Sequence, residues 1–123
     1  RIRAAGGAYV EALRALADHR EQRAADDLEE ACRLAARLLE DDDPLAWRLQ
    51  ALWGRTLATM GRDEQAERIL VRALLAIPSD RRGVDPSAAL MLESLATIYQ
   101  RQDRRDEFGV LKRIAMPSTA VWR

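Results

Sequence analysis

Apolar side chains recur every three or four residues through the middle of this chain, and signals for β-strands are almost absent. One run comprises Leu45, Leu49, Leu52, Trp53, Leu57 and Met60, and the next comprises Ala66, Ile69, Leu70, Ala73, Leu74 and Ile77. Each run places its apolar side chains along one face of a helix. Only Gly61 and Arg62 stand between the two runs, so the helices should be antiparallel neighbours. The sequence therefore predicts an all-α fold with a helical hairpin at its centre.

Two Asp-Pro pairs mark helix starts. Asp43-Pro44 and Asp85-Pro86 each combine an N-cap carboxylate with a proline at the first helical position, where the fixed φ of proline suits a helix. A capping box is expected at Asp27 and Glu30. We expect helices at about 3–22, 27–40, 44–60, 63–77, 86–102 and 104–115. They form three hairpins of one domain, at about 3–40, 44–77 and 86–115, with a tail at 116–123.

Small residues occupy fixed places in the central hairpin. Counted from Trp47 as the first position, Gly54 is eighth, Gly61 fifteenth, Ala66 twentieth, Ala73 twenty-seventh and Pro78 thirty-second. This pattern resembles the tetratricopeptide repeat, a 34-residue pair of antiparallel helices. The resemblance implies that Gly54 and Ala66 meet where the two helices cross. It also implies that the hairpins stack into a right-handed α-solenoid.

The outer hairpins resemble the repeat less closely. In the third, Asp103 replaces the turn glycine and Phe108 replaces a small residue, so we expect either a wider crossing or an irregular end repeat there. Other repeat positions are occupied as expected, by Leu92, Leu95, Ala96, Tyr99 and Ala115. In the first, Ala31, Ala35 and Leu38 fit the second helix, but the linker "HREQRAA" is several residues too long.

The resemblance further implies a concave wall, lined by the first helix of each repeat, that binds a peptide or a partner helix. The pocket-facing positions of the family fall on Arg48, Ala51, Arg55, Thr59, Leu90, Glu93, Thr97, Gln100 and Arg101. Arg48 and Arg55 are two turns apart and share a face. We interpret them, with Arg101, as ligands for an acidic segment or a C-terminal carboxylate; the alternative is a solvated helix face. The chaperone-binding members of the family use lysine and asparagine there, and this chain contains no asparagine.

The last expected helix carries apolar residues on two stripes. Phe108, Leu111 and Ala115 form the inner stripe, and Val110 and Ile114 form the outer one. The end of a repeat array needs a cover for such a face. Three covers are open: the tail with Trp122, a further repeat, or a second copy that makes a homodimer through this helix.

Composition excludes several kinds of chemistry. Twenty basic residues balance twenty acidic ones, whereas domains that bind nucleic acid or membrane surfaces usually have a basic excess. Cys32 and His19 are the single residues of their types, which rules out a zinc site. They fall on separate expected helices and so form no nucleophile–base pair. The aspartate runs lack the spacing of a calcium loop. We expect no enzyme activity, cofactor or metal, and no nucleic-acid or membrane partner.

These observations predict a protein–protein interaction module. An arginine-rich and alanine-rich composition is typical of GC-rich bacterial genes, and the lack of a long apolar run favours a cytoplasmic location. The chain starts at Arg1 without a methionine, which we interpret as a fragment of a longer protein. The alternative function is a sensing or regulatory segment of a larger bacterial transcription regulator or signalling ATPase.

Overall fold

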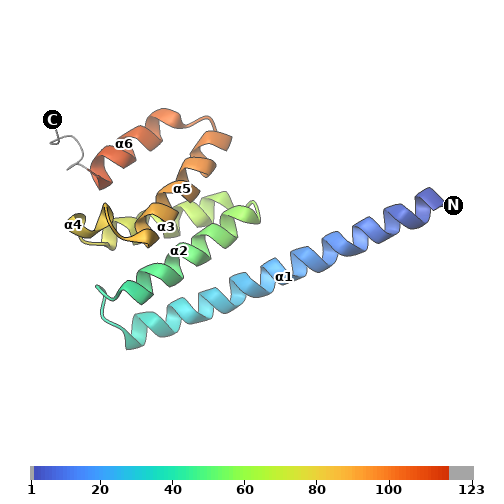
Figure 1. Ribbon diagram of the computed structural model, residues 1–123, viewed down its shortest axis with the longest axis horizontal. Coiled ribbons are helices and arrows are strands. Elements are labelled where there is room, and N and C mark those ends of the chain that lie inside the picture. Colours follow the sequence, from blue (N-terminus) through green and yellow to red (C-terminus); the bar gives the residue numbers. More distant parts are fainter. Residues whose placement is uncertain (1, 117–123) are drawn as a thin grey trace.

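The computed structural model describes the backbone of residues 2–116 and the side chains from residue 7 to residue 116 (Figure 1). Over this range the chain is all-helical, as predicted. The helices are α1 (Ile2–Leu38), α2 (Pro44–Thr59), α3 (Asp63–Ala76), α4 (Ser79–Arg82), α5 (Pro86–Arg101) and α6 (Arg105–Ala115). The expected tail with Trp122 lies outside the described residues, except for Met116.

The first expected hairpin is wrong, because its two helices form the single long helix α1. The break was expected at a capping box, but no glycine or proline stands between residues 22 and 30 to interrupt the helix. Glu30 pairs with Arg33 at 2.9 Å instead. The Gln22 side chain donates to Asp26 at 2.9 Å. Such contacts, three or four residues apart, support a continuous helix.

The two later hairpins begin in the same way, as the Asp-Pro pairs predict. The carboxylate of Asp43 accepts the N–H of Leu45 at 2.9 Å. The carboxylate of Asp85 accepts the N–H of Ser87 at 2.8 Å. In each case the proline is at the start of the helix. Both N-caps are therefore confirmed.

The two turns also share one geometry. Gly61 follows α2 with a φ of 81°, and Asp103 follows α5 with a φ of 55°. In each turn the N–H of the next residue, Arg62 or Arg104, donates to the carbonyl five residues earlier, which is the Schellman arrangement. Glycine adopts a positive φ freely, and aspartate is one of the few other residues that tolerate it. The replacement of glycine by Asp103 thus preserves the turn.

The core lies where α2, α3 and α5 meet. α1 packs on α2, α2 packs on α3 and α5, and α5 packs on α3 and α6. Trp47, which the apolar pattern left out of the core, is 2% exposed, and its indole N–H donates to the carbonyl of Asp41 at 3.2 Å. Trp53 is only half-buried, and Leu45 is exposed. The apolar stripe predicted the buried residues of α2 incorrectly here, because α2 is packed on more than one side.

Small residues let α2 and α3 approach closely. Gly54 is buried, and a β-carbon added there would lie 2.5 Å from Cγ of Leu70. Ala66 and Ala73 on α3 are buried as well, at 0% and 1% exposure. The three atoms nearest to a β-carbon added at Gly54 all belong to Leu70, one turn further along α3 than Ala66.

The third hairpin differs at Phe108. This ring is half-buried and packs edge-on against Tyr99, with the centroids 5.9 Å apart. Of the outer stripe on α6, Val110 is 48% exposed and Ile114 is 58% exposed. The exposure of this stripe within the described residues agrees with the sequence analysis.

The segment expected as a loop between the last two hairpins contains the short helix α4. Its last residue, Arg82, donates to the carbonyls of Leu74, Leu75 and Ile77 at 2.8 to 3.2 Å. The same guanidinium donates to the carbonyl of Ala115 at 3.1 Å. Arg82 therefore satisfies the carbonyls at the ends of both α3 and α6, where a cation is favoured by the helix dipole.

Candidate partner-binding groove

α2 and α5 lie side by side and run in the same direction. Their first turns line a depression of about 430 Å³, which includes Pro44 and Pro86. Their last turns line a second depression of about 150 Å³, which includes Thr59 and Arg101. The N-terminal ends of the two helices are neighbours, and so are their C-terminal ends, so the helices are parallel. We call the two depressions together the α2–α5 groove.

The groove contains most of the residues that sequence analysis assigned to the partner. Its second depression is lined by Arg55, Thr59, Glu93, Thr97 and Arg101. Its first depression is lined by Arg48 and Leu90. Gln100 is exposed but lines neither depression.

Ala51 corrects the sequence analysis. It was expected to face the partner, yet its exposed fraction is 0%. The small side chain lies in the core cluster with Leu95 and Ile98 of α5. A residue at this position of α2 therefore serves helix packing and cannot contact a ligand.

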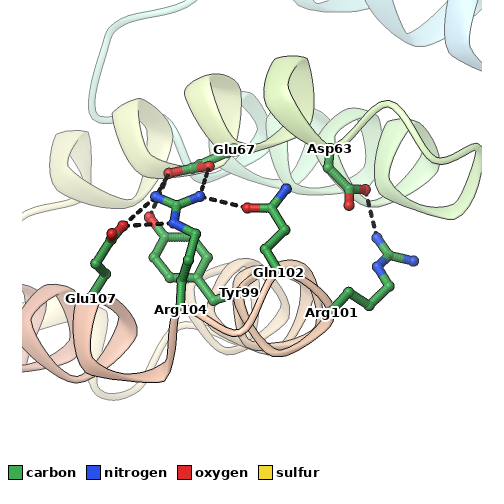
Figure 2. A network of polar contacts seen from close by, with 7 residues as sticks. All are labelled: Asp63, Glu67, Tyr99, Arg101, Gln102, Arg104 and Glu107. Carbon is green, nitrogen blue, oxygen red and sulfur yellow. Dashed lines mark hydrogen bonds and ion pairs between the residues drawn. The ribbon is translucent and has the colours of Figure 1, made fainter.

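The three arginines of the groove differ in their partners. Arg101 donates to the carboxylate of Asp63 at 2.6 Å (Figure 2). It also donates to the carbonyl of Ala58 at 3.2 Å. Arg48 and Arg55 are exposed, and within residues 7–116 the guanidinium group of neither has a hydrogen bond or an ion pair. Two guanidinium groups are thus available in the groove, while the third is engaged by α3.

The other polar groups of the groove are mixed. The hydroxyls of Thr59 and Thr97 donate to carbonyls of their own helices, at Arg55 and Glu93, over 3.0 and 3.1 Å. The carboxylate of Glu93 has no ion-pair partner among the described residues, although Arg55 lines the same depression. The groove therefore offers two guanidinium groups and the carboxylate of Glu93 to a ligand, and the N-cap carboxylate of Asp85 also lines its first depression.

A second polar cluster joins α3, α5 and α6, and Figure 2 shows it at close range. The Arg104 guanidinium donates to both carboxylate oxygens of Glu67, at 2.8 and 3.0 Å. It also donates to Glu107 at 2.7 Å and to Gln102 at 2.6 Å, and it lies 4.3 Å from the centre of the Tyr99 ring. The Tyr99 hydroxyl completes the cluster by donating to Glu67 at 2.7 Å.

The charges of this cluster are fixed at neutral pH. The hydrogen bond from Arg104 holds the pKa of Glu67 below its ordinary value, and the bond from Tyr99 acts in the same direction against burial. Burial, with the bond to Glu67, raises the pKa of Tyr99 to about 12. A site for proton transfer needs a pKa near the working pH, so we interpret the cluster as a structural clamp. Sequence analysis missed it because Glu67 and Arg104 are 37 residues apart.

Cys32 and His19 are on one helix, not on the separate helices that were expected. They are 13 residues apart along α1, which corresponds to about 20 Å. Burial raises the pKa of Cys32 to about 11, which disfavours the thiolate. The two side chains therefore cannot act as a nucleophile and its base.

Two further properties concern the described part of the chain alone. Within it, no three side chains of histidine, cysteine, aspartate or glutamate converge as a metal site would require. None of its helices combines the length and the apolarity needed to cross a membrane.

Comparisons of the sequence with models of protein families, with curated proteins and with solved structures gave no match. The resemblance to the tetratricopeptide repeat therefore depends on the residues and helix packing of this chain.

Proposed function

We propose that this chain is a tetratricopeptide-like repeat module, with its hairpins arranged as a right-handed α-solenoid, and that it binds a protein partner in the α2–α5 groove. Repetition supports the fold. Pro86 follows Pro44 by 42 residues, and the caps and turns of the two hairpins correspond at this spacing. The excess over the 34 residues of the family's repeat equals the length of segment 78–85, which contains α4. Parallel packing of α2 on α5 is what stacked hairpins require.

The observation that carries the proposed function is the state of Arg48 and Arg55. Both are exposed on one face of α2, about 10 Å apart along its axis, and neither has an acidic partner in the described chain. Arg101 and Arg104, by contrast, are paired with acids of the chain itself. Unpaired guanidinium groups beside a groove suit carboxylates, which they hold through two parallel hydrogen bonds. The ligand is therefore an acidic segment of another protein.

Fluorescence anisotropy with labelled peptides tests this proposal. A glutamate-rich peptide should bind the 123-residue chain, and a lysine-rich peptide of equal length should not. Reversing both charges, Arg48→Glu with Arg55→Glu, should weaken binding of the acidic peptide at least about tenfold, because two charge-assisted contacts become repulsive.

A matched control separates the groove from overall charge. Arg68→Glu with Arg72→Glu changes the net charge by the same amount on α3, where both residues are exposed outside the groove. This pair should keep most of the affinity. Equal loss in both double variants, or no loss in the first, would refute a specific site at Arg48 and Arg55.

A further inference from the structure

An exposed apolar stripe runs along α1. It consists of Tyr9, Leu13, Leu16, Ala24, Ala31, Leu34 and Leu38, each three or four residues from the next except where a polar residue stands between. Its large side chains are 43 to 76% exposed. The buried residues Ala25 and Ala35 lie on either side of a direction about a quarter of a turn from the stripe, on the side that packs on α2. The stripe is therefore a second face of α1, which the described chain leaves uncovered.

The packing of the other helices indicates that this face should have a neighbour. α3, the second helix of its hairpin, packs on both α2 and α5, whereas α1 packs mainly on α2. Contact between α1 and the rest begins near Gln22, whose side chain accepts from Arg62 at 2.5 Å. The N-terminal half of α1 extends beyond the other helices (Figure 1), and residues 7–20 are all exposed.

The burial of residues on α2 also indicates an uncovered place beside α1. Four residues of α5 that face its preceding neighbours, Ala88, Met91, Leu95 and Ile98, are 0% exposed. Their equivalents 42 residues earlier, Ala46, Leu49, Trp53 and Thr56, are only half-buried. α5 is covered by two preceding helices and α2 by one. One helix is missing beside α1 and α2.

The polar residues that interrupt the stripe indicate what this helix is. Arg20 follows Leu16 by four residues, and Asp27 precedes Ala31 by four. The two charges are thus placed symmetrically about the middle of the stripe, between residues 23 and 24, and they are opposite in sign. Within the described chain neither forms an ion pair.

We propose that α1 pairs antiparallel with α1 of a second copy of this chain. In the register centred between residues 23 and 24, Arg20 of each copy meets Asp27 of the other. Six of the seven apolar residues then match without adjustment: Tyr9 lies opposite Leu38, Leu13 opposite Leu34, and Leu16 opposite Ala31. Ala24 lies at the centre of the pair, level with Arg23 of the other copy. Every contact occurs twice, as a two-fold interface requires. This homodimer uses α1, and not the C-terminal helix considered from the sequence.

The pairing also explains the long helix. The N-terminal half of α1 cannot fold back on its own second half, because α1 is unbroken. It can fill the equivalent place in a second copy, next to the half-buried face of α2. Exchange of an identical element between two chains is a common route to a dimer.

Charge reversal tests the register. By sedimentation velocity, the wild-type chain should have about twice the 13.9 kDa mass of one copy. Arg20→Asp or Asp27→Arg alone places like charges opposite each other and should raise the dissociation constant about tenfold or more. The double variant restores opposite charges and should restore the dimer. Asp18→Arg, on the opposite side of α1, is the matched control and should remain dimeric.

Cross-linking gives a second measurement that does not depend on the effect of charges on folding. In a Cys32→Ala background, the double variant Leu13→Cys with Leu34→Cys should form a covalent dimer on oxidation. Each single variant should not, because an antiparallel pair separates equivalent residues. Within one chain the two cysteines are about 30 Å apart along α1 and cannot join.

Two results would overturn the proposal. One is a wild-type chain that stays monomeric at concentrations near 1 mM, where even a weak dimer forms. The other is a dimer unaffected by both single charge reversals, or one that the single cysteine variants cross-link as well as the double variant. The last outcome would indicate a parallel pair or a different face.

Discussion

At the scale of single residues, Gly54 fixes the distance between α2 and α3. A β-carbon there would overlap the buried side chain of Leu70. We predict that Gly54→Ala lowers the free energy of unfolding by about 1–3 kcal/mol, because neighbours in a packed core have little room to move. Urea unfolding followed by circular dichroism measures this.

Gly7 provides the control for this prediction. It is in α1, and apart from its chain neighbours and the backbone of its own helix no atom lies within 4 Å of a β-carbon added there. Gly7→Ala should leave stability unchanged or raise it by up to about 1 kcal/mol, since alanine is the better helix former. If both substitutions stabilise, helix propensity outweighs the close approach and the reason given for Gly54 is wrong.

The residues that the sequence predicted well act over short distances. Asp43, Asp85 and Gly61 each satisfy or shape backbone within a few residues of themselves, so their neighbours identify their roles. Arg82 and Arg104 act on carbonyls and carboxylates more than thirty residues away. In a chain with twenty basic residues, nothing local distinguishes these two arginines from exposed ones.

At the scale of helices, the cluster around Glu67 joins α3 to α5 and α6. Because Arg104 and Tyr99 lower the pKa of Glu67, the ionised carboxylate stabilises the fold. This contribution is complete above the ordinary glutamate pKa of about 4.3. It is lost as the pH falls through the lower value that Glu67 has in the folded chain.

Glu67→Gln should therefore destabilise the chain at pH 7 and matter less at lower pH. We expect the melting temperatures of the two proteins to converge as the pH falls from 5 to 2. Glu64→Gln, an exposed neighbour on α3, is the control and should follow the wild type. A constant difference between Glu67→Gln and the wild type over this range would mean that the carboxylate charge contributes nothing.

The helices themselves were predictable where capping and turn signals agree with the apolar period, as in α2, α3 and α5. The sequence analysis failed at α1, where it placed a break at Asp27. An N-cap residue such as Asp27 starts a new helix only where the chain gains enough buried surface by turning back into a hairpin. Here the second face of α1 has no neighbour among the described residues, so residues of good helix propensity continue the helix through that point.

At the scale of the whole molecule, the groove follows from two parallel helices of successive hairpins. Their equivalent positions line up, so a repeat pattern was sufficient to place Arg55, Thr59, Glu93 and Thr97 together. The pattern was not sufficient to show which charges are engaged. Pairing of Arg101 with Asp63 depends on how α5 sits against α3, and burial of Ala51 depends on how closely α2 meets its neighbours.

The carboxylate of Glu93 provides a test of the charge of the ligand that binds in this groove. Its carboxylate shares a depression with Arg55, and no cation of the described chain pairs with it. An acidic ligand held by Arg48 and Arg55 is therefore repelled at Glu93, and Glu93→Gln should tighten binding of the glutamate-rich peptide about two- to fivefold, as expected for an exposed charge pair. The gain should shrink as salt rises from 50 to 500 mM, because the interaction is screened.

Asp106→Gln, at an exposed position on α6 outside the groove, removes the same charge and should leave the affinity nearly unchanged. If Glu93→Gln weakens binding, the carboxylate contacts a donor of the ligand, and the partner is a mixed-charge segment and not a purely acidic one.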